Sequence, residues 1–337
     1  PIIANVHLHA EDGQLILTAT DLEVTVRTSI EAEVEKEGGT TLPAKRLYSV
    51  FREITGSSLE IDVNSDNIAS VTCDASFFKL HGLPEKDFPP LPSMDGGSTF
   101  TIAQRTLRDM LKRVVYAAST DESRYVLNGA LLSFKDEKLT VVATDGRRLA
   151  LIEEEVEFPA EAEHDLIVPT KTSYELIRSL QDEGEVEIIC TEKQIAFKYQ
   201  NVLIISKLIE GVFPNFRQVI PASSEYRIPI ERETLFQAVK RAALITVEQS
   251  KAVKLVFGQN RLELITETPQ IGEAREKIPV KYSGPEIAAS FNPEFVMDPL
   301  KVLDCDEIFF EITDGTSPGV IKADVPFLYV LMPMRLH

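Results

Sequence analysis

A threefold internal repeat limits the folds open to this chain of 337 residues. The segment Gly13–Asp21 returns at Lys138–Asp145, a shift of 145 − 21 = 124 residues, and a fainter third copy lies at Arg261–Thr268. Phe88-Pro89 returns as Phe213-Pro214 with nearly the same shift, 213 − 88 = 125. Several pairs in one phase indicate three similar structural units, because a repeat architecture reuses one supersecondary plan.

Each copy combines strand and helix patterns. Alternating β-branched residues predict strands at 59–63, 139–143, 186–190 and 308–312. Apolar residues at helical spacing predict helices over Ala44–Ile54, Ile102–Val114, Tyr174–Leu180, Leu235–Ala242 and Phe295–Leu300. We therefore expect an α+β fold of three repeated domains, each with two helices packed on antiparallel sheets.

The repeat phase also sets the expected domain boundaries, at 1–97, 98–225 and 226–337. In the second copy the earlier helix begins 145 − 102 = 43 residues before Asp145. The matching helix of the first copy would begin at 21 − 43 = −22. We therefore expect the first domain to be N-terminally incomplete, without one strand and one helix.

The charge of the chain is unevenly distributed. A formal net charge of −18 argues against wrapping nucleic acid, because phosphate binding depends on Lys and Arg. However, basic residues concentrate on the predicted helices, whereas acidic residues gather in strands and loops such as 31–37 and 153–163. The basic candidates are Lys45, Arg46, Arg105, Arg108, Lys112, Arg113, Lys171, Arg178, Lys240 and Arg241. They predict a positive helix face that attracts phosphates without reading bases. The alternative is the ordinary charge of solvated helix faces.

The chain ends in an apolar segment, Tyr329–Leu336, with two methionines around a proline. On composition alone, a last edge strand that closes a core is the simpler interpretation. Methionine is flexible and polarisable, which suits a surface that must accept different guests. The repeat phase ends the third unit where the earlier units pass into linkers, so we expect these last residues to be free to form part of a binding site.

Chemical motifs point away from catalysis. The chain has no Walker loop, GxSxG, HExxH or Rossmann fingerprint. Asp145 stands in a Thr-Asp-Gly segment, but its repeat partner Asp21 favours a structural turn in which Asp binds backbone amides. His7 and His9 share one face of a strand, yet no third His or Cys is near in sequence, so we predict no metal site.

Cysteine usage and hydropathy indicate an intracellular protein. The three cysteines, Cys73, Cys190 and Cys305, are odd in number and widely spaced, which argues against a disulfide framework or a zinc site. No apolar run approaches the ~20 residues of a membrane span, and we recognise no signal peptide. We expect a cytoplasmic protein without a membrane partner.

The whole chain resembles the bacterial DNA polymerase III beta subunit, the DNA sliding clamp. The segments that carry the resemblance are Ala143–Ala150, Arg124–Gly129, Phe213–Arg217 and Val330–Leu336. The resemblance implies that two chains close head to tail into a ring of six similar domains around duplex DNA. Such a ring is a non-catalytic processivity factor without a cofactor, which tethers the replicative polymerase to its template.

The resemblance also implies specific site residues. A peptide-binding pocket between the second and third domains is implied at Leu127, Thr144, Gly146, Arg147, Arg148, Leu149, Pro214, Val219, Val330, Met332, Pro333, Met334 and Arg335. The implied dimer contacts are Phe78 and Leu80 on one side and Leu244 and Ile245 on the other. Arg124, Tyr125 and Lys171 match DNA-contacting positions. Arg147 and Gln218 depart from the His and Arg of the best-known members, which bears on motif preference.

The implied partners are duplex DNA without sequence preference, a second copy of the chain, and proteins that carry clamp-binding peptides. Those proteins are replicative and other DNA polymerases, the clamp loader, and mismatch-repair and ligase-type proteins, working at the nucleoid. A non-ring repeat protein that binds an anionic ligand on its basic helix face is the alternative function. It predicts a monomer, whereas the clamp predicts a stable dimer.

Overall fold

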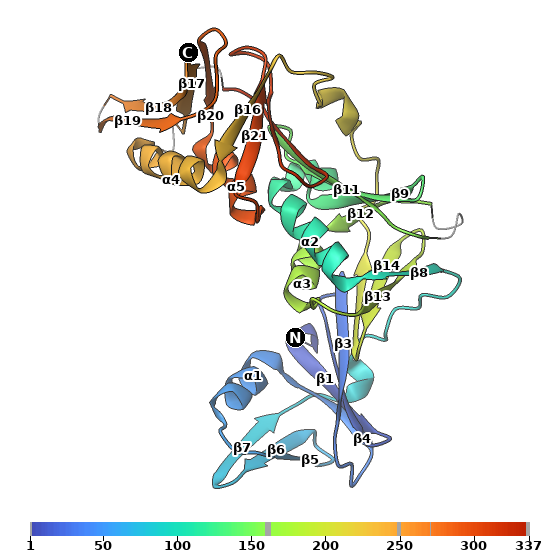
Figure 1. The fold of residues 1–337 in the computed structure, drawn as a ribbon. Helices are drawn as coiled ribbons and strands as arrows, with labels where there is room; N and C mark the ends of the chain where they lie inside the picture. Colours follow the sequence, from blue (N-terminus) through green and yellow to red (C-terminus); the bar gives the residue numbers. More distant parts are fainter. Residues whose placement is uncertain (1, 159–162, 248–250, 270, 335–337) are drawn as a thin grey trace. The chain divides into compact units, whose positions relative to one another are not determined.

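The structure, a computed structural model, describes residues 2–158, 163–247, 251–269 and 271–334 (Figure 1). It divides into two compact units, which we describe separately. Unit 1 contains Pro1–Ala103 and Glu183–Leu208. Unit 2 contains Gln104–Asp182 and Ile209–His337.

Unit 1 is built on an eight-stranded antiparallel sheet in the order β4-β1-β2-β3-β15-β14-β13-β8. Its strands are β1 (Asn5–Glu11), β2 (Gln14–Thr20), β3 (Val24–Glu31), β4 (Gly38–Pro43), β8 (Ser98–Ala103), β13 (Glu185–Cys190), β14 (Gln194–Tyr199) and β15 (Val202–Lys207). A second sheet contains β5 (Glu60–Val63), β6 (Ile68–Cys73) and β7 (Ser76–His81), in that order. Helix α1 (Ala44–Glu53) buries Leu47 against Leu8, Leu42 and Ala69.

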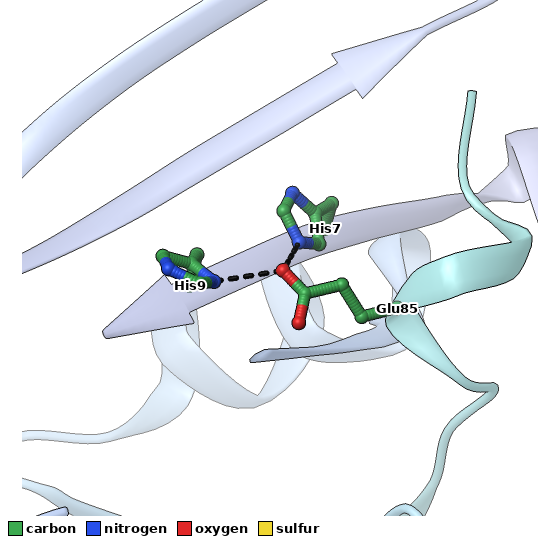
Figure 2. A group of neighbouring side chains, drawn as sticks. All are labelled: His7, His9 and Glu85. Carbon is green, nitrogen blue, oxygen red and sulfur yellow. Dashed lines mark hydrogen bonds and ion pairs between the residues drawn. The ribbon is translucent and has the colours of Figure 1, made fainter. Parts of the chain in front are cut away.

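Two short 3-10 helices complete unit 1, η1 (Ile2–Ala4) and η2 (Glu85–Asp87). Helix η2 lies beside β1, where the Glu85 carboxylate forms hydrogen bonds with His7 and His9 (Figure 2). Cys190 is buried in β13, and burial raises the pKa of its thiol to about 12. Cys73 and Cys305 are also free thiols, as expected from the cysteine spacing.

Unit 2 repeats the plan with a second eight-stranded sheet, in the order β12-β9-β10-β11-β23-β22-β21-β16. Its strands are β9 (Gly129–Lys135), β10 (Lys138–Thr144), β11 (Arg148–Glu155), β12 (Asp165–Pro169), β16 (Tyr226–Glu231), β21 (Glu307–Ile312), β22 (Gly319–Lys322) and β23 (Phe327–Leu331). A four-stranded sheet has the order β19-β18-β17-β20. Its strands are β17 (Val253–Gly258), β18 (Arg261–Thr268), β19 (Gly272–Pro279) and β20 (Ile287–Phe291).

Four α-helices of unit 2 form a continuous layer. They are α2 (Gln104–Val114), α3 (Thr170–Ser179), α4 (Arg232–Ala242) and α5 (Pro293–Val302). Helix α2 contacts both α3 and α5, and α5 contacts α4 (Figure 1). Short 3-10 helices connect the strands and helices: η3 (Val115–Ala117), η4 (Glu122–Leu127), η6 (Phe216–Val219) and η7 (Ala243–Ile245).

The predicted elements are confirmed with one shift. Ile102 was expected in the first turn of a helix, but it is buried in β8 opposite Val186, and α2 begins at Gln104. Apolar spacing alone cannot separate the last residues of a strand from the first turn of the helix that follows. Strand ends and helix starts recur together as expected, with Pro43 and Pro169 directly preceding α1 and α3.

The two eight-stranded sheets join neighbouring repeats in the same way and in the same register. In unit 1, β3 of the first repeat pairs with β15 of the second, with Val26 opposite Ile204. In unit 2, β11 of the second repeat pairs with β23 of the third, with Ala150 opposite Tyr329. The shifts are 150 − 26 = 124 and 329 − 204 = 125, which are the repeat shifts of the sequence.

The turns before β3 and β11 confirm the structural role expected for the repeated Asp. The Asp21 Oδ1 atom accepts hydrogen bonds from the backbone N–H groups of Glu23 and Val24. The Asp145 Oδ1 atom accepts from the N–H groups of Arg147 and Arg148 in the same way. Each Asp therefore fixes the turn that delivers a joining strand.

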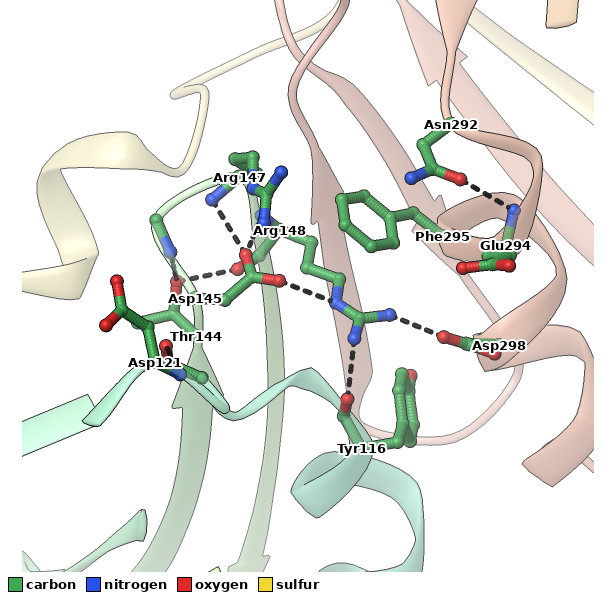
Figure 3. A network of polar contacts seen from close by, with 12 residues as sticks. Tyr116, Asp121, Thr144, Asp145, Arg147, Arg148, Asn292, Glu294, Phe295 and Asp298 are labelled. Atoms are coloured by element: carbon green, nitrogen blue, oxygen red, sulfur yellow. Dashed lines mark hydrogen bonds and ion pairs between the residues drawn. The ribbon is translucent and has the colours of Figure 1, made fainter. Parts of the chain in front are cut away.

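Arg148 connects the β10–β11 turn with helix α5 (Figure 3). Its side chain is only 10% exposed, and its guanidinium contacts Asp145 at 3.1 Å and Asp298 at 2.5 Å. It also donates to the carbonyl oxygen of Tyr116 at 2.8 Å and lies 4.2 Å from the ring centre of Phe295. Burial lowers the pKa of Arg148, but Tyr329, Asp298 and Asp145 outweigh it and hold the pKa above its ordinary value.

Replacing Arg148 should destabilise unit 2 strongly. Arg148→Ala leaves the buried Asp145 carboxylate without its cation, although Asp298 keeps Lys301 at 2.7 Å, and breaking a buried pair costs about 3 kcal/mol or more. Arg147→Ala is the matched control, because the neighbouring arginine is exposed and should change the free energy of unfolding by at most about 0.5 kcal/mol. Urea unfolding followed by circular dichroism measures both variants. Equal unfolding midpoints for the two would contradict the anchoring role of Arg148.

Candidate functional site

One face of the sheet in unit 2 carries an apolar row that crosses five strands. Ile167 pairs with Leu131, Leu131 with Val142, Val142 with Leu151, and Leu151 with Leu328. Two positions along, Leu149 lies opposite Val330 in the same buried cluster. This apolar row defines the floor of the candidate site.

The buried residues of the floor are at most 7% exposed, because half-buried side chains pack over them. The residues that pack on the floor are half-buried hydrophobic side chains: Val126, Ile209, Phe213, Phe216 and Ile220. Four of them belong to the segment 209–220, and the Ile209 N–H donates to the Ile167 carbonyl oxygen at 2.9 Å. An apolar surface that keeps partly exposed aromatic residues is typical of a site that binds a partner.

The C-terminal segment has two parts with different roles. Through Leu331 it is the buried strand β23, with Val330 1% and Leu331 0% exposed. It lies between β11 and β22, so the simpler interpretation was right about a core strand and wrong about an edge. Beyond it, Met332 and Met334 are 40% and 38% exposed. The methionines therefore remain available to a guest, whereas Val330 belongs to the floor.

The tail is held beside the β10–β11 turn by its backbone. The Met332 N–H donates to the Arg147 carbonyl oxygen at 3.0 Å, and the Met334 N–H donates to the Ser290 carbonyl oxygen at 2.7 Å. Gly146 has a positive φ of 83°, which glycine adopts without steric cost. Thr144 stabilises the same turn, because its hydroxyl accepts from the Gly146 N–H and donates to the Arg148 carbonyl oxygen.

The two neighbouring arginines have opposite placements. Arg148 points inward to Asp145 and Asp298, as described above, and is an anchor of the turn. Arg147 is exposed, and its guanidinium lies 5.6 Å from the ring centre of Phe295 (Figure 3). Of these two arginines, Arg147 is the one that presents its charge at the surface beside the tail.

Three of the sequence-predicted pocket residues stand next to residues that pack on the floor. Leu127 follows Val126, Pro214 follows Phe213, and Val219 precedes Ile220. Pro333 is half-buried between the two methionines, and Arg335 lies outside the described residues. Sequence reasoning missed Leu131, Leu151, Phe213 and Phe216. Strand alternation and the Phe-Pro-Asn-Phe segment were the signals that could have found them.

The predicted basic residues divide into paired and unpaired groups. Arg108 contacts Asp182 at 2.7 Å, and Arg241 contacts Glu276 through two hydrogen bonds. Weaker contacts join Arg105 to Asp109, Arg124 to Asp121 and Arg178 to Glu175. Within the described ranges, Lys45, Arg46, Lys112, Arg113 and Lys240 form no ion pair. Lys171 is exposed at the start of α3, and Tyr125 is 58% exposed.

The predicted dimer residues lie at the margins of two sheets. Phe78 and Leu80 belong to β7, an outer strand of the sheet β5-β6-β7. Leu244, which is 77% exposed, and Ile245 belong to η7, which contacts the outer strand β19.

None of the described helices is long and apolar enough to cross a membrane.

Comparison with known proteins matches all three repeats to one family. Residues 1–92, 101–215 and 217–335 match the N-terminal, central and C-terminal domains of the DNA polymerase III beta subunit. The beta sliding clamp of Chlamydia muridarum is 36% identical over 337 residues, covering 100% of this chain and 92% of that protein. The Escherichia coli K12 beta sliding clamp is 32% identical over 343 residues, covering 100% and 93%.

A solved structure agrees with these relatives. The sliding clamp of Bartonella birtlesii, determined bound to griselimycin, superposes with a TM-score of 0.95 at 33% identity and covers 100% of this chain and 92% of that one. Repeat phase, domain matches and fold lead to one conclusion. The chain belongs to the DNA polymerase III beta subunit family, the bacterial sliding clamps.

Proposed function

We propose that this clamp closes its ring by pairing β7 of one protomer with β19 of the other. A sliding clamp is a non-catalytic processivity factor that self-associates around DNA, and the proposal concerns the residues that do so here. One observation carries it. Strands β3, β11 and β19 occupy corresponding positions in the first, second and third repeats. Strands β7, β15 and β23 correspond in the same way. The pairs β3–β15 and β11–β23 join neighbouring repeats within the chain. In the described part of the chain, β7 and β19 remain outer strands.

The register of the two internal strand pairs predicts which residues of β7 and β19 face each other between protomers. Val26 lies opposite Ile204, and Ala150 lies opposite Tyr329. The equivalent residues in β19 and β7 are Ala274 and Phe78, with shifts of 274 − 150 = 124 and 204 − 78 = 126. An outer strand with exposed Phe77 is prone to aggregate unless another chain pairs with it. Leu244 and Ile245 lie beside β19, where they would add apolar contact.

We propose domain boundaries at 97/98 and 225/226. The repeat phase supports both, and the family matches that end at residue 92 and begin at 101 bracket the first, whereas the matches that end at 215 and begin at 217 fall about ten residues before the second. Each boundary then falls before a strand that leads into a helix, β8 before α2 and β16 before α4.

We propose that DNA is contacted by basic residues on the helices, chiefly those without an internal partner. Lys45, Lys112 and Lys240 are exposed at helix ends. Mobile, hydrated charges that bind phosphates release counterions equally at every register, which permits sliding. Arg108 and Arg241 are held by Asp182 and Glu276, so their share should be smaller. Lys171, Arg124 and Tyr125 complete the proposed DNA-contacting set.

We propose that partner peptides bind beside the tail, on the half-buried apolar side chains that cover the floor, with the exposed Met332 and Met334 and the charge of Arg147 as contacts. Apolar walls with a few polar groups are typical of peptide sites. Candidate partners beyond the replicative polymerase are the clamp loader and mismatch-repair and ligase-type proteins, acting at the nucleoid.

The dimer register can be tested by cross-linking. The variant with Phe78→Cys and Ala274→Cys should form covalent dimers on mild oxidation or with a short bis-maleimide, because facing Cβ atoms lie about 5 Å apart. Phe77→Cys with Ala274→Cys is the matched control, since a shift of one residue turns the side chain to the other face. Non-reducing electrophoresis measures the product. Equal cross-linking of both pairs would refute the register.

The DNA proposal predicts topological retention. Clamp loaded on nicked circular DNA should remain bound during gel filtration and leave once the circle is linearised. Lys112→Glu with Lys240→Glu should weaken loading and reduce its salt dependence, because fewer counterions are released, whereas Lys254→Glu with Lys138→Glu, on strands, should change neither. Equal retention before and after linearisation would rule out an encircling ring.

The peptide site predicts a selective loss of affinity. Met332→Ala should lower the affinity for a labelled C-terminal peptide of a bacterial replicative polymerase at least tenfold, as expected for a central apolar contact. Fluorescence anisotropy measures this affinity. Removal of residues from Met332 onward should have the same effect or a greater one. Removal from Val330 onward is unsuitable, because it deletes buried residues of β23. Met94→Ala is the control. Unchanged affinity in both tail variants would contradict the assignment.

A further inference from the structure

Two histidines and a glutamate converge in unit 1, where His7 and His9 of β1 meet Glu85 of η2 (Figure 2). His7 Nε2 lies 2.8 Å and His9 Nδ1 lies 2.7 Å from the same oxygen, Oε1 of Glu85. The ligand atoms of the three residues all lie within 4.8 Å of one another. The two imidazoles and the carboxylate therefore surround one small volume.

The fold holds each of these side chains from a different direction. His7 and His9 stand two residues apart on β1, so strand alternation places both on one face. The His7 ring stacks on Phe88 with centroids 5.3 Å apart. Glu85 reaches the histidines from η2, which follows the second sheet.

Gly39 leaves the space that the Glu85 carboxylate occupies. Gly39 lies opposite His9 in the β1–β4 ladder. A Cβ atom there would stand only 2.3 Å from both the carboxyl carbon and Oε2 of Glu85. The absent side chain thus permits the carboxylate to lie against the histidines.

The second nitrogen of His9 has a carboxylate of its own. His9 Nε2 lies 3.4 Å from Oε2 of Glu11, so this imidazole faces a carboxylate at both nitrogens. A neutral imidazole can donate to only one of them. If Nε2–H faces Glu11, the Nδ1 lone pair points toward the Glu85 oxygen, and the two acceptors repel. A cation between Nδ1 and the Glu85 carboxylate removes this repulsion. A carboxylate behind a histidine is the usual outer partner of a metal ligand.

We propose that His7 Nε2, His9 Nδ1 and the Glu85 carboxylate bind one divalent transition-metal ion, with Zn²⁺ as the best match. Two imidazoles and a carboxylate are a ligand set that Zn²⁺ accepts, with one position left to water. Bonds of about 2.0–2.1 Å in a tetrahedral site require ligand atoms about 3.3 Å apart. Glu85 is 38% exposed, so its carboxylate can withdraw by the small distance that the ion needs.

The ion would fasten the segment after β7 to strand β1. The Leu83 backbone already pairs with Thr41 of β4, two residues before Glu85. Because β7 is the strand proposed to meet the partner protomer, the metal would stabilise the chain next to that join. The metal site itself rests on the side-chain geometry and is independent of the peptide, DNA and dimer proposals.

The test measures metal binding by the untagged, chelator-treated full chain. Isothermal titration with Zn²⁺ should show one site per chain, and Co²⁺ should give the intense visible absorption of a tetrahedral site. His9→Ala and Glu85→Gln should each lower the affinity for Zn²⁺ at least tenfold. His164→Ala, which removes an exposed imidazole in unit 2, should bind Zn²⁺ like the unaltered chain.

Gly39→Ala is the sharpest variant, because it keeps all three ligands and displaces only the Glu85 carboxylate. It should weaken Zn²⁺ severalfold while circular dichroism and the sedimentation coefficient remain those of the unaltered chain. The proposal is overturned if the unaltered chain binds no more Zn²⁺ than His9→Ala does. A Co²⁺ spectrum like that of the hydrated ion would equally reject it, as would an equal loss of Zn²⁺ affinity in His164→Ala.

Discussion

The structure depends on one constraint: the outer strand of a sheet presents unpaired N–H and C=O groups that need a partner. Each repeat contributes two strands that would be outer strands on their own. One corresponds to β3 and the other corresponds to β15. The chain satisfies this need twice internally, at β3–β15 and β11–β23, in matching register. Three similar repeats provide three strands of each type, so β7 and β19 remain outer strands in the described part of the chain, which is why we propose that they pair between two chains.

The candidate peptide-binding site lies at one of these internal strand pairs. The β11–β23 pair places Leu149 opposite Val330 in the apolar floor, and the same ladder ends where Met332 bonds to Arg147. Asp145 both fixes the turn and binds Arg148, which reaches α5 through Asp298. The rigid core of the join and the exposed surface beside it are therefore held by one short stretch of chain.

Much of this organisation could be predicted from the sequence, because it depends on local periodicity. The repeat phase gave the order of the strands and helices, and the Asp21–Asp145 correspondence correctly identified a turn. The sequence could not separate Arg147 from Arg148, since two adjacent arginines differ only in which carboxylates the fold brings near. Glu85 escaped notice for the same reason, because it lies 78 residues from His7 and meets it only through tertiary packing. The tail was ambiguous because it changes from core to surface within a few residues.

The joins have a consequence for the order in which the protein is made. Strand β3 leaves the ribosome well before its partner, since Ile204 follows Val26 by 204 − 26 = 178 residues. Strand β11 waits for β23, 329 − 150 = 179 residues later and close to the end of the chain. At about 5–20 residues per second, each strand remains an open sheet edge for roughly 10 to 40 s. A nascent chain of this kind presents open β edges through much of its translation, and those edges are natural substrates for chaperones.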